Sequence, residues 1–365
     1  MKGLFINNKK AKDSIYESGL MTYNCLALSV KYSLDYQEID IDDRTVPTGY
    51  DFYFFNYHPL TLQWLDASAL KKNLSLCISM VLEVAPNDPF VYCSPRDFDL
   101  YCVLDPTVSI SNKKVYAFPR PLEKTIIDLP TANNPIPVIG TFGFATKGKG
   151  FQHVVDAVNA EFDEAIVKIN IPHGDFVPGS KEYADFLAKV CRERAKEGIR
   201  VEVTHDFMDK EDLIKWCAAN TLNCFLYDRN MPGLAATTDQ AIVAQRPLAV
   251  SSNDTFRHIT AYLKPYPECG LKTSIDGSLP AVLQMLNDWS PENFTKKFEQ
   301  MLEENSQLLR QRYKPAKAPF VIPLKNKSIF DTVGKRYKKY KRKFQNLKLS
   351  SLFKHDDSKY GKEII

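Results

Sequence analysis

The sequence lacks the features of membrane-spanning, secreted and metal-clipped proteins. Its longest apolar run, Leu76–Leu82, is far shorter than the roughly 18 residues that cross a bilayer, and the apolar stretch at Met1–Asn8 is too short for a signal peptide. The eight cysteines include no C-x-x-C pair, which favours buried free thiols. His173, His205 and His258 share no metal-ligand spacing. We therefore expect a cytoplasmic protein without a metal site.

What is present is the composition of an ordinary globular protein, with 44% apolar and 25% charged residues. The length of 365 residues predicts about two domains. Short strand-like runs alternate with amphipathic helical stretches such as Leu20–Val30 and Phe151–Val158. The expected strands are Gly3–Asn7, Tyr36–Ile41, Asp51–Asn56, Leu76–Val84, Pro89–Cys93, Lys114–Phe118, Val138–Phe142, Ala165–Ile171, Ile199–Val203, Asn223–Tyr227 and Leu248–Ser251.

This alternation predicts an α/β fold of two Rossmann-like lobes, each with a parallel sheet, that face one another across a cleft. We place the first lobe at residues 1–121, a proline-bearing linker at 122–135, the second lobe at 136–310 and a basic helical extension at 311–365. Ligands in such folds bind beyond the carboxyl ends of the strands, so the cleft is the expected site.

Residues 138–151, VIGTFGFATKGKGF, indicate a strand, a glycine-rich loop and the start of a helix. Backbone N–H groups around Gly143, the helix N-terminus and Lys147 or Lys149 would then lie where a pyrophosphate can bind. The loop is not a Walker A motif, because no Ser or Thr follows Gly-Lys in the required frame, and it does not match G-x-G-x-x-G. A tight loop with solvated lysines is the alternative interpretation.

Residues 224–251 indicate a strand, a loop, a helix start rich in small residues and another strand. Small residues here allow a ligand to approach the backbone, threonine hydroxyls can donate to it, and a helix N-terminus favours an anion. Asp239 or Gln240, in the first turn of this helix, could bind ribose hydroxyls. The candidate ligand-contacting residues are Gly233, Thr237, Thr238, Asp239 and Gln240.

Together these segments resemble the C-terminal lobe of GT-B glycosyltransferases that use nucleotide sugars, of the family 4-like type, over about Val138–Leu286. Lys149-Gly150 matches the Lys-Gly pair of that family. Residues 201–213 resemble its strand and base-contacting loop, and residues 246–251 resemble its Pro-containing turn and last strand.

The sequence departs from the family at three positions. Phe144 stands where an arginine is usual, and Pro232 and Gln240 stand where the family has the two glutamates of its E-x7-E region. Asp228 and Asp239 are the nearest acidic residues. These departures bear on the identity of the donor and on activity.

The resemblance implies a GT-B glycosyltransferase that moves a sugar from a nucleotide sugar to a glycan or lipid-linked acceptor in surface polysaccharide synthesis, with no cofactor and no metal. Lys149 would neutralise the donor pyrophosphate, and the amides at Thr237–Asp239 would hold its oxygens. Gln240 or Asp239 would bind the ribose. Two other classes stay open: a non-catalytic sugar-nucleotide-binding or scaffold protein of the same fold, and a GT-B-type sugar-nucleotide epimerase.

Three further residues are expected near the cleft. His58 follows the strand Asp51–Asn56 and is a candidate catalytic or acceptor-binding residue, with a polar loop position as the alternative. Gly19 is expected in a loop that approaches the donor phosphates after the first strand. Arg257 follows a strand of the second lobe and is a candidate for the cleft.

The C-terminal extension concentrates positive charge. The chain carries a net charge of +4, yet residues 325–354 contain eleven Lys and Arg and one acid, so the preceding body is mildly acidic. Aromatic and aliphatic residues from Phe330 to Leu347 recur at spacings of three and four, on one helix face. This pattern is typical of a helix on an anionic membrane surface, here the inner face of a membrane. A helix packed on the body is the alternative, and no nucleic-acid-binding module is recognisable.

Overall fold

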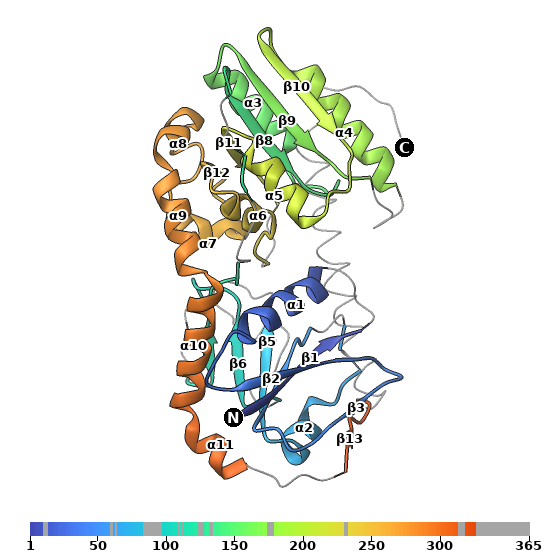
Figure 1. The fold of residues 1–365 in the computed structure, drawn as a ribbon. Coiled ribbons are helices and arrows are strands. Elements are labelled where there is room, and N and C mark those ends of the chain that lie inside the picture. Colours follow the sequence, from blue (N-terminus) through green and yellow to red (C-terminus); the bar gives the residue numbers. More distant parts are fainter. Residues whose placement is uncertain are drawn as a thin grey trace.

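The computed structural model describes residues 1–9, 14–58, 61–62, 64–82, 97–108, 110, 112–122, 128–130, 134–173, 179–229, 233–312 and 318–325. They form two α/β lobes, which Figure 1 shows one above the other. The strand predicted at 89–93, much of the predicted linker and the extension beyond Lys325 lie outside the described residues.

The first lobe is built on a parallel sheet. Its elements are β1 (Lys2–Asn8), α1 (Ser14–Leu26), β2 (Ser33–Ile39), β4 (Phe52–Phe55), α2 (Ala67–Asn73), β5 (Leu76–Val81), β6 (Leu100–Val103) and β7 (Val115–Ala117). The sheet has six strands in the order β2-β1-β4-β5-β6-β7. Every side chain of β4, β5 and β6 is buried, because helices and loops cover both faces of a parallel sheet. The sequence did not predict β6.

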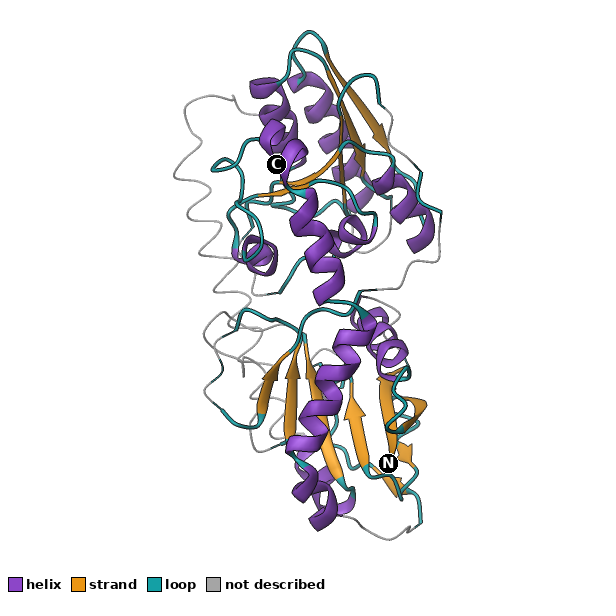
Figure 2. Ribbon diagram, turned by 60° about the vertical axis from the view of Figure 1, so that its left-hand side comes forward, coloured by secondary structure: helices purple, strands orange, loops and turns teal. Residues whose placement is uncertain are grey.

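The second lobe repeats this plan with a parallel sheet of five strands, β8 (Val138–Phe142), β9 (Ala165–Asn170), β10 (Ile199–Thr204), β11 (Leu222–Phe225) and β12 (Leu248–Val250). Their order in the sheet is β10-β9-β8-β11-β12. The predicted helix stripe Phe151, Val154, Val155 and Val158 is confirmed, since all four side chains are buried against the sheet. Figure 2 shows helices on both sides of these strands. The helices of this lobe are α3 (Phe151–Glu161), α4 (Ser180–Arg194), α5 (Lys210–Ala218), α6 (Thr237–Val243), η1 (Asp254–Phe256), α7 (Arg257–Thr260), α8 (Leu271–Gly277) and α9 (Leu279–Asp288).

The chain then returns to the first lobe. Helix α10 (Pro291–Glu304), followed by α11 (Ser306–Arg312), runs down beside the first sheet in Figure 1. Phe298 packs edge-on against Phe52 and Phe54, with ring centroids 5.7 and 5.5 Å apart. We predicted a second lobe of residues 136–310, which includes most of these two helices. In the structure, their apolar side chains pack into the core of the first lobe instead. The helical periodicity gave no information on which sheet their apolar face would cover.

A small antiparallel sheet joins β13 (Phe320–Val321) to β3 (Thr45–Val46). Beyond it, the backbone N–H of Lys325 donates to the carbonyl oxygen of Trp64 at 2.8 Å. No helix among the described residues is long and apolar enough to cross a membrane. The seven described cysteines are free thiols, and six of them are buried.

Candidate functional site

The loops that follow β8 and β11 meet at the edge of the second sheet. These strands are neighbours, and the strand order reverses between them, so their carboxyl ends form the point where ligands of doubly wound folds bind. The N–H of Asp228 donates to the carbonyl oxygen of Gly148 at 3.2 Å, which ties the two loops together. The two segments predicted from sequence are therefore adjacent in space.

Glycines make this close approach possible. Gly143, Gly148 and Gly150 have φ values of +148°, +79° and +67°, a backbone region that disfavours side chains. A Cβ atom at Gly150 would lie 1.8 Å from the carbonyl oxygen of Leu226, the residue after β11. The start of α3 thus lies directly against the β11 loop.

Lys149 lies inside this junction, next to Tyr227. Its Nζ donates a 2.8 Å hydrogen bond to the Tyr227 hydroxyl and lies 4.5 Å from the centre of that ring. Arg229 contacts the same ring at 5.1 Å. Burial, followed by repulsion from Arg229, lowers the pKa of Lys149 to about 7. Among the described residues no carboxylate forms an ion pair with either cation.

The hydroxyl of Tyr227 also contacts Oγ1 of Thr237, at 2.9 Å, and burial raises the pKa of this tyrosine to about 12. A hydrogen-bonded chain therefore runs from the Lys149 ammonium to the first residue of α6. Lys147, in contrast, is exposed to solvent. Of the two lysines left open by the sequence, Lys149 is the one that contacts both loops.

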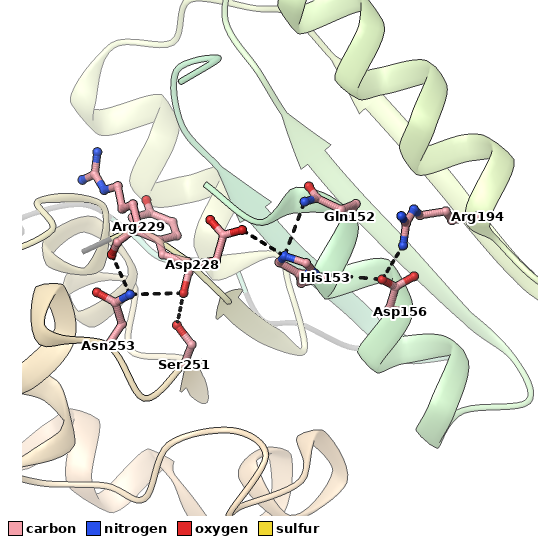
Figure 3. Close-up of polar contacts among 9 residues, drawn as sticks. Gln152, His153, Asp156, Arg194, Asp228, Arg229, Ser251 and Asn253 are labelled. Carbon is pink, nitrogen blue, oxygen red and sulfur yellow. Dashed lines mark hydrogen bonds and ion pairs between the residues drawn. The ribbon is translucent and has the colours of Figure 1, made fainter. Parts of the chain in front are cut away.

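Polar side chains at the end of β12 hold the β11 loop in place (Figure 3). Ser251 donates to the carbonyl oxygen of Tyr227 at 2.7 Å, and Asn253 donates to that of Arg229 at 2.6 Å. The exposed carboxylate of Asp228 points toward His153 of α3, with 3.3 Å between Oδ2 and Nε2. Asp228 therefore lies at this junction but on its outer side.

A cavity of about 230 Å³ lies between the lobes. From the second lobe, Asp239 and Gln240 line it together with Ala236, and from the first lobe Glu17, Ser18 and Arg120 do so. These last residues come from α1 and from the segment after β7. The predicted interlobe cleft thus exists in the described part of the chain, next to the first turn of α6.

An ion pair crosses this cavity. Nε of Arg120 lies 2.9 Å from Oδ2 of Asp239, and the two side chains are 12% and 16% exposed. Oδ1 of Asp239 has no hydrogen-bond partner among the described residues. Burial raises the pKa of Asp239 above its usual value, and Arg120 opposes that rise. Asp239 is therefore already paired with a cation, while its second carboxylate oxygen is buried without a hydrogen-bond partner among the described residues.

Two exposed aromatic rings lie beside the glycine-rich loop. Phe144 follows β8 and Phe207 follows β10; the rings stack with centroids 6.4 Å apart. Their side chains are 41% and 72% exposed, unusually high fractions for phenylalanine. Phe207 belongs to the segment that resembles a base-contacting loop. Phe144, at the position where an arginine was expected, contributes an aromatic face instead of a charge.

Several predicted positions differ from expectation. Gly19 lies within α1 and not in a loop, and a Cβ atom there would lie 2.2 Å from Nδ2 of Asn56, so this glycine serves close packing. Thr238 is fully buried and donates to the carbonyl oxygen of Ala235 at 2.8 Å, so its hydroxyl faces the interior. The N–H of Asp239 donates to the carbonyl oxygen of Ala236 and is not available as an anion-binding amide.

The remaining candidates lie around the site without completing it. His58 follows β4 as predicted, but its side chain is buried and it is not among the residues that line the cavity. Arg257 pairs with Asp105 of the first lobe, with 2.8 Å between Nε and Oδ2. Gly233 precedes α6 and is half-buried. Arg257 therefore joins the lobes, a role that the sequence did not indicate.

Two of the histidines that share no metal-ligand spacing in the sequence lie side by side in the structure. His173 and His205 stack with ring centroids 4.1 Å apart, and both contact Asp185. His258 is fully buried beside Trp289, in the same lobe. Linear spacing could not reveal this pair, because the two residues follow different strands of one parallel sheet.

Some residues of the site were missed by sequence reasoning. Arg120 lies after a predicted strand and had no motif to mark it, and Tyr227 was read only as the end of a strand. Arg229 stands beside Asp228 in the segment 224–251, so a basic residue next to the predicted phosphate loop was a signal that could have been used.

No family model matches the sequence, and no curated protein matches it. Several solved structures, in contrast, are similar to this chain. HepE of Anabaena, in complex with UDP and glucose, aligns with a TM-score of 0.54 and 10% identity over 83% of this chain and 100% of HepE. The lipopolysaccharide outer core galactosyltransferase WaaB aligns with a TM-score of 0.53 and 13% identity over 84% and 100% of the two chains.

Sucrose-phosphate synthase from Thermosynechococcus elongatus aligns with a TM-score of 0.50 and 14% identity, over 85% of this chain and 98% of that one. These similarities show that the chain has the GT-B fold found in nucleotide-sugar glycosyltransferases, which confirms the predicted fold class. At such low identity they show the fold alone.

Proposed function

We propose that this protein is a glycosyltransferase that takes its sugar from a nucleoside diphosphate sugar. The observation that carries the proposal is the pair of cations at Tyr227. Lys149 and Arg229 converge on one ring at the carboxyl ends of β8 and β11, and no described carboxylate neutralises them. Such a site favours an anion, and a diphosphate supplies one of the right charge.

In this proposal Lys149 stabilises the charge that builds on the leaving diphosphate, which is the part of the transition state that a transferase must favour. Gln240 and Asp239, which line the cavity from the first turn of α6, contact the donor. Phe144 and Phe207 provide an apolar surface for the base. The acceptor enters from the first lobe, whose residues Glu17 and Ser18 line the same cavity.

The acceptor of the proposed reaction is a glycan or a lipid-linked sugar. The basic extension at 325–354 supports a lipid-linked acceptor, because a net positive segment with an aromatic face suits an anionic leaflet. The protein would then act in surface polysaccharide synthesis, at the inner face of a membrane. The extension lies outside the described residues, so its sequence pattern is the support for this part.

A second candidate function is nucleotide-sugar binding without transfer. The ion pair between Asp239 and Arg120 favours it, because the acid nearest the missing glutamates is held by a cation. A sugar-nucleotide epimerase of the same fold is a further alternative from sequence. The products separate the three: a transferred sugar, no product, or an isomer of the donor sugar.

Lys149→Met tests the proposal, with Lys147→Met as the matched control from the same loop. Lys149→Met should lose at least about 100-fold in turnover, the usual cost of removing one transition-state charge contact, while its thermal midpoint stays at or above that of the parent. Lys147→Met should retain activity, since its side chain is exposed. Full activity in Lys149→Met would show that the diphosphate binds elsewhere.

A further inference from the structure

Two histidines and an aspartate converge in the second lobe, outside the interlobe cavity. His173 follows β9, His205 follows β10, and Asp185 lies on α4. The imidazole planes are inclined by 11°. Nε2 of His173 and Nε2 of His205 lie 2.8 Å and 3.6 Å from the same carboxylate oxygen, Oδ1 of Asp185. Three groups that bind metal ions thus point to one place.

The backbone holds the two histidines in this arrangement. The parallel ladder of β9 and β10 pairs Asn170 with Thr204 and continues past the strand ends. There the N–H of Ile171 donates to the carbonyl oxygen of Thr204 at 2.9 Å, and the N–H of His173 donates to that of His205 at 3.2 Å. The backbone positions of both histidines therefore follow from the sheet register.

One contact determines the tautomer of the neutral His205 ring. Its Nδ1 lies 2.8 Å from the carbonyl oxygen of Ile171, which can only accept a hydrogen bond. Nδ1 therefore carries the hydrogen, and in the neutral ring Nε2 carries a lone pair. That lone pair faces the Asp185 carboxylate, which is also an acceptor. Two facing acceptors are stabilised by a cation shared between them.

We propose that His173, Asp185 and His205 bind a divalent transition metal ion of the zinc class. Bonds of about 2.0–2.2 Å place the donor atoms of a tetrahedral zinc ion roughly 3.4 Å apart, between the two distances seen here. Two imidazoles and one carboxylate suit zinc better than magnesium or calcium, which prefer oxygen. The Ile171 carbonyl supplies the outer hydrogen bond that commonly orients a ligating histidine.

The geometry leaves room for solvent on the ion. The side chains of His173, His205 and Asp185 are 31%, 24% and 55% exposed, so the remaining coordination positions face water. A bound ion would link α4 to the loop between β10 and α5. In that loop, His205 lies two residues before Phe207. This role is independent of the proposed function, because none of the three residues lines the interlobe cavity.

Titration of the chelator-treated full chain, without a histidine tag, with Zn²⁺ alone tests the proposal. Calorimetry should give one ion per chain, and Co²⁺ in its place should give visible absorption bands. His173→Ala and His205→Ala should each weaken Zn²⁺ binding at least tenfold. His153→Ala is the matched control, at a partly exposed histidine that also contacts aspartates, and should bind as the parent does.

Asp185→Asn guards against loss of folding, because this side chain is more than half exposed and the amide keeps its shape. It too should weaken Zn²⁺ binding at least tenfold while its circular dichroism stays that of the parent. Absence of Zn²⁺ binding in the parent would overturn the proposal. Binding that survives all three substitutions would place the ion elsewhere and overturn it equally.

Discussion

Arg120 of the first lobe donates a 2.9 Å hydrogen bond to Asp239 of the second, across the cavity where a donor sugar is proposed to bind. A second pair, Arg257 with Asp105, crosses between the lobes in the opposite sense, with the cation on the second lobe. Both acids are largely buried. Two ion pairs whose partners are far apart in the sequence therefore connect the lobes.

Removing Arg120 should leave the Asp239 carboxylate buried without its cation. We expect Arg120→Met to lower the free energy of unfolding by about 3 kcal/mol at pH 7, the usual cost of breaking a buried pair from one side. Asp239→Asn in the Arg120→Met background should recover part of that loss. Urea unfolding of the two single variants and the double variant measures the coupling, and additive effects would show that the pair does not contribute.

The pH dependence of Arg120→Met follows from the raised pKa of Asp239. A carboxyl group whose pKa is raised by folding stabilises the protein when protonated, and this contribution is lost as pH rises from about 4 through its pKa in the folded state. Without Arg120 that pKa rises further. Arg120→Met should thus lower the free energy of unfolding less near pH 4.5 than at pH 7. An equal decrease at both pH values would contradict the raised pKa of Asp239.

Lys149 should take up a proton when a diphosphate binds. Its pKa of about 7 leaves it mostly neutral at pH 8, and a diphosphate beside it favours the charged form. Calorimetric titration with UDP at pH 8, in buffers of different ionisation enthalpy, should report uptake of close to one proton. At this pH the phosphate itself, with a second pKa of about 6, is already ionised.

The lysine variants provide the controls for this titration. Lys149→Met should bind UDP without proton uptake and more weakly, whereas Lys147→Met should retain the uptake of the parent. Binding by the parent with no proton exchanged would mean that Lys149 does not meet the phosphates, even if UDP binds between the lobes.

Replacing Gly150 by alanine should destabilise the protein far more than replacing Gly179. Both glycines directly precede a helix, and both have left-handed backbone dihedral angles. Gly179→Ala should cost about 1 kcal/mol for the backbone alone, because no described atom lies within 4 Å of the added Cβ. Gly150→Ala adds a clash at 1.8 Å with the Leu226 carbonyl oxygen, so we expect a loss above about 3 kcal/mol and weaker UDP binding. Similar thermal unfolding of both variants would exclude close contact between the two loops.

Sequence patterns correctly predicted the features that depend on interactions between residues close together in the chain. The alternation of strands and helices, the buried face of α3 and the glycine-rich loop at Lys149 follow from side-chain periodicity and backbone freedom. Gly19 shows the limit of such reasoning. Glycine disfavours a helix by about 1 kcal/mol, yet α1 includes it because a larger residue would meet Asn56.

Contacts between segments far apart in the sequence could not be predicted from these patterns. The sequence could not pair Arg120 with Asp239, since that contact depends on how two lobes face one another. His173 and His205 meet because β9 and β10 are neighbours in register, which linear spacing does not encode. Helix α10 covers the first sheet for the same reason: its apolar face is visible in the sequence, but its partner is not.

The basic extension should attach the protein to anionic membranes without contributing to the fold. Lys325 still bonds to Trp64, so the appropriate truncation ends at Lys325, two residues beyond Pro323. Basic residues contribute about 1 kcal/mol each near an anionic surface, so engagement of half of the eleven would give roughly 5 kcal/mol. The full chain should sediment with phosphatidylglycerol vesicles, less so at high salt, and the truncated chain should not. Unfolding of the truncated chain would instead assign the aromatic face to the core, because surface attachment by a separate helix leaves the thermal midpoint of the body unchanged.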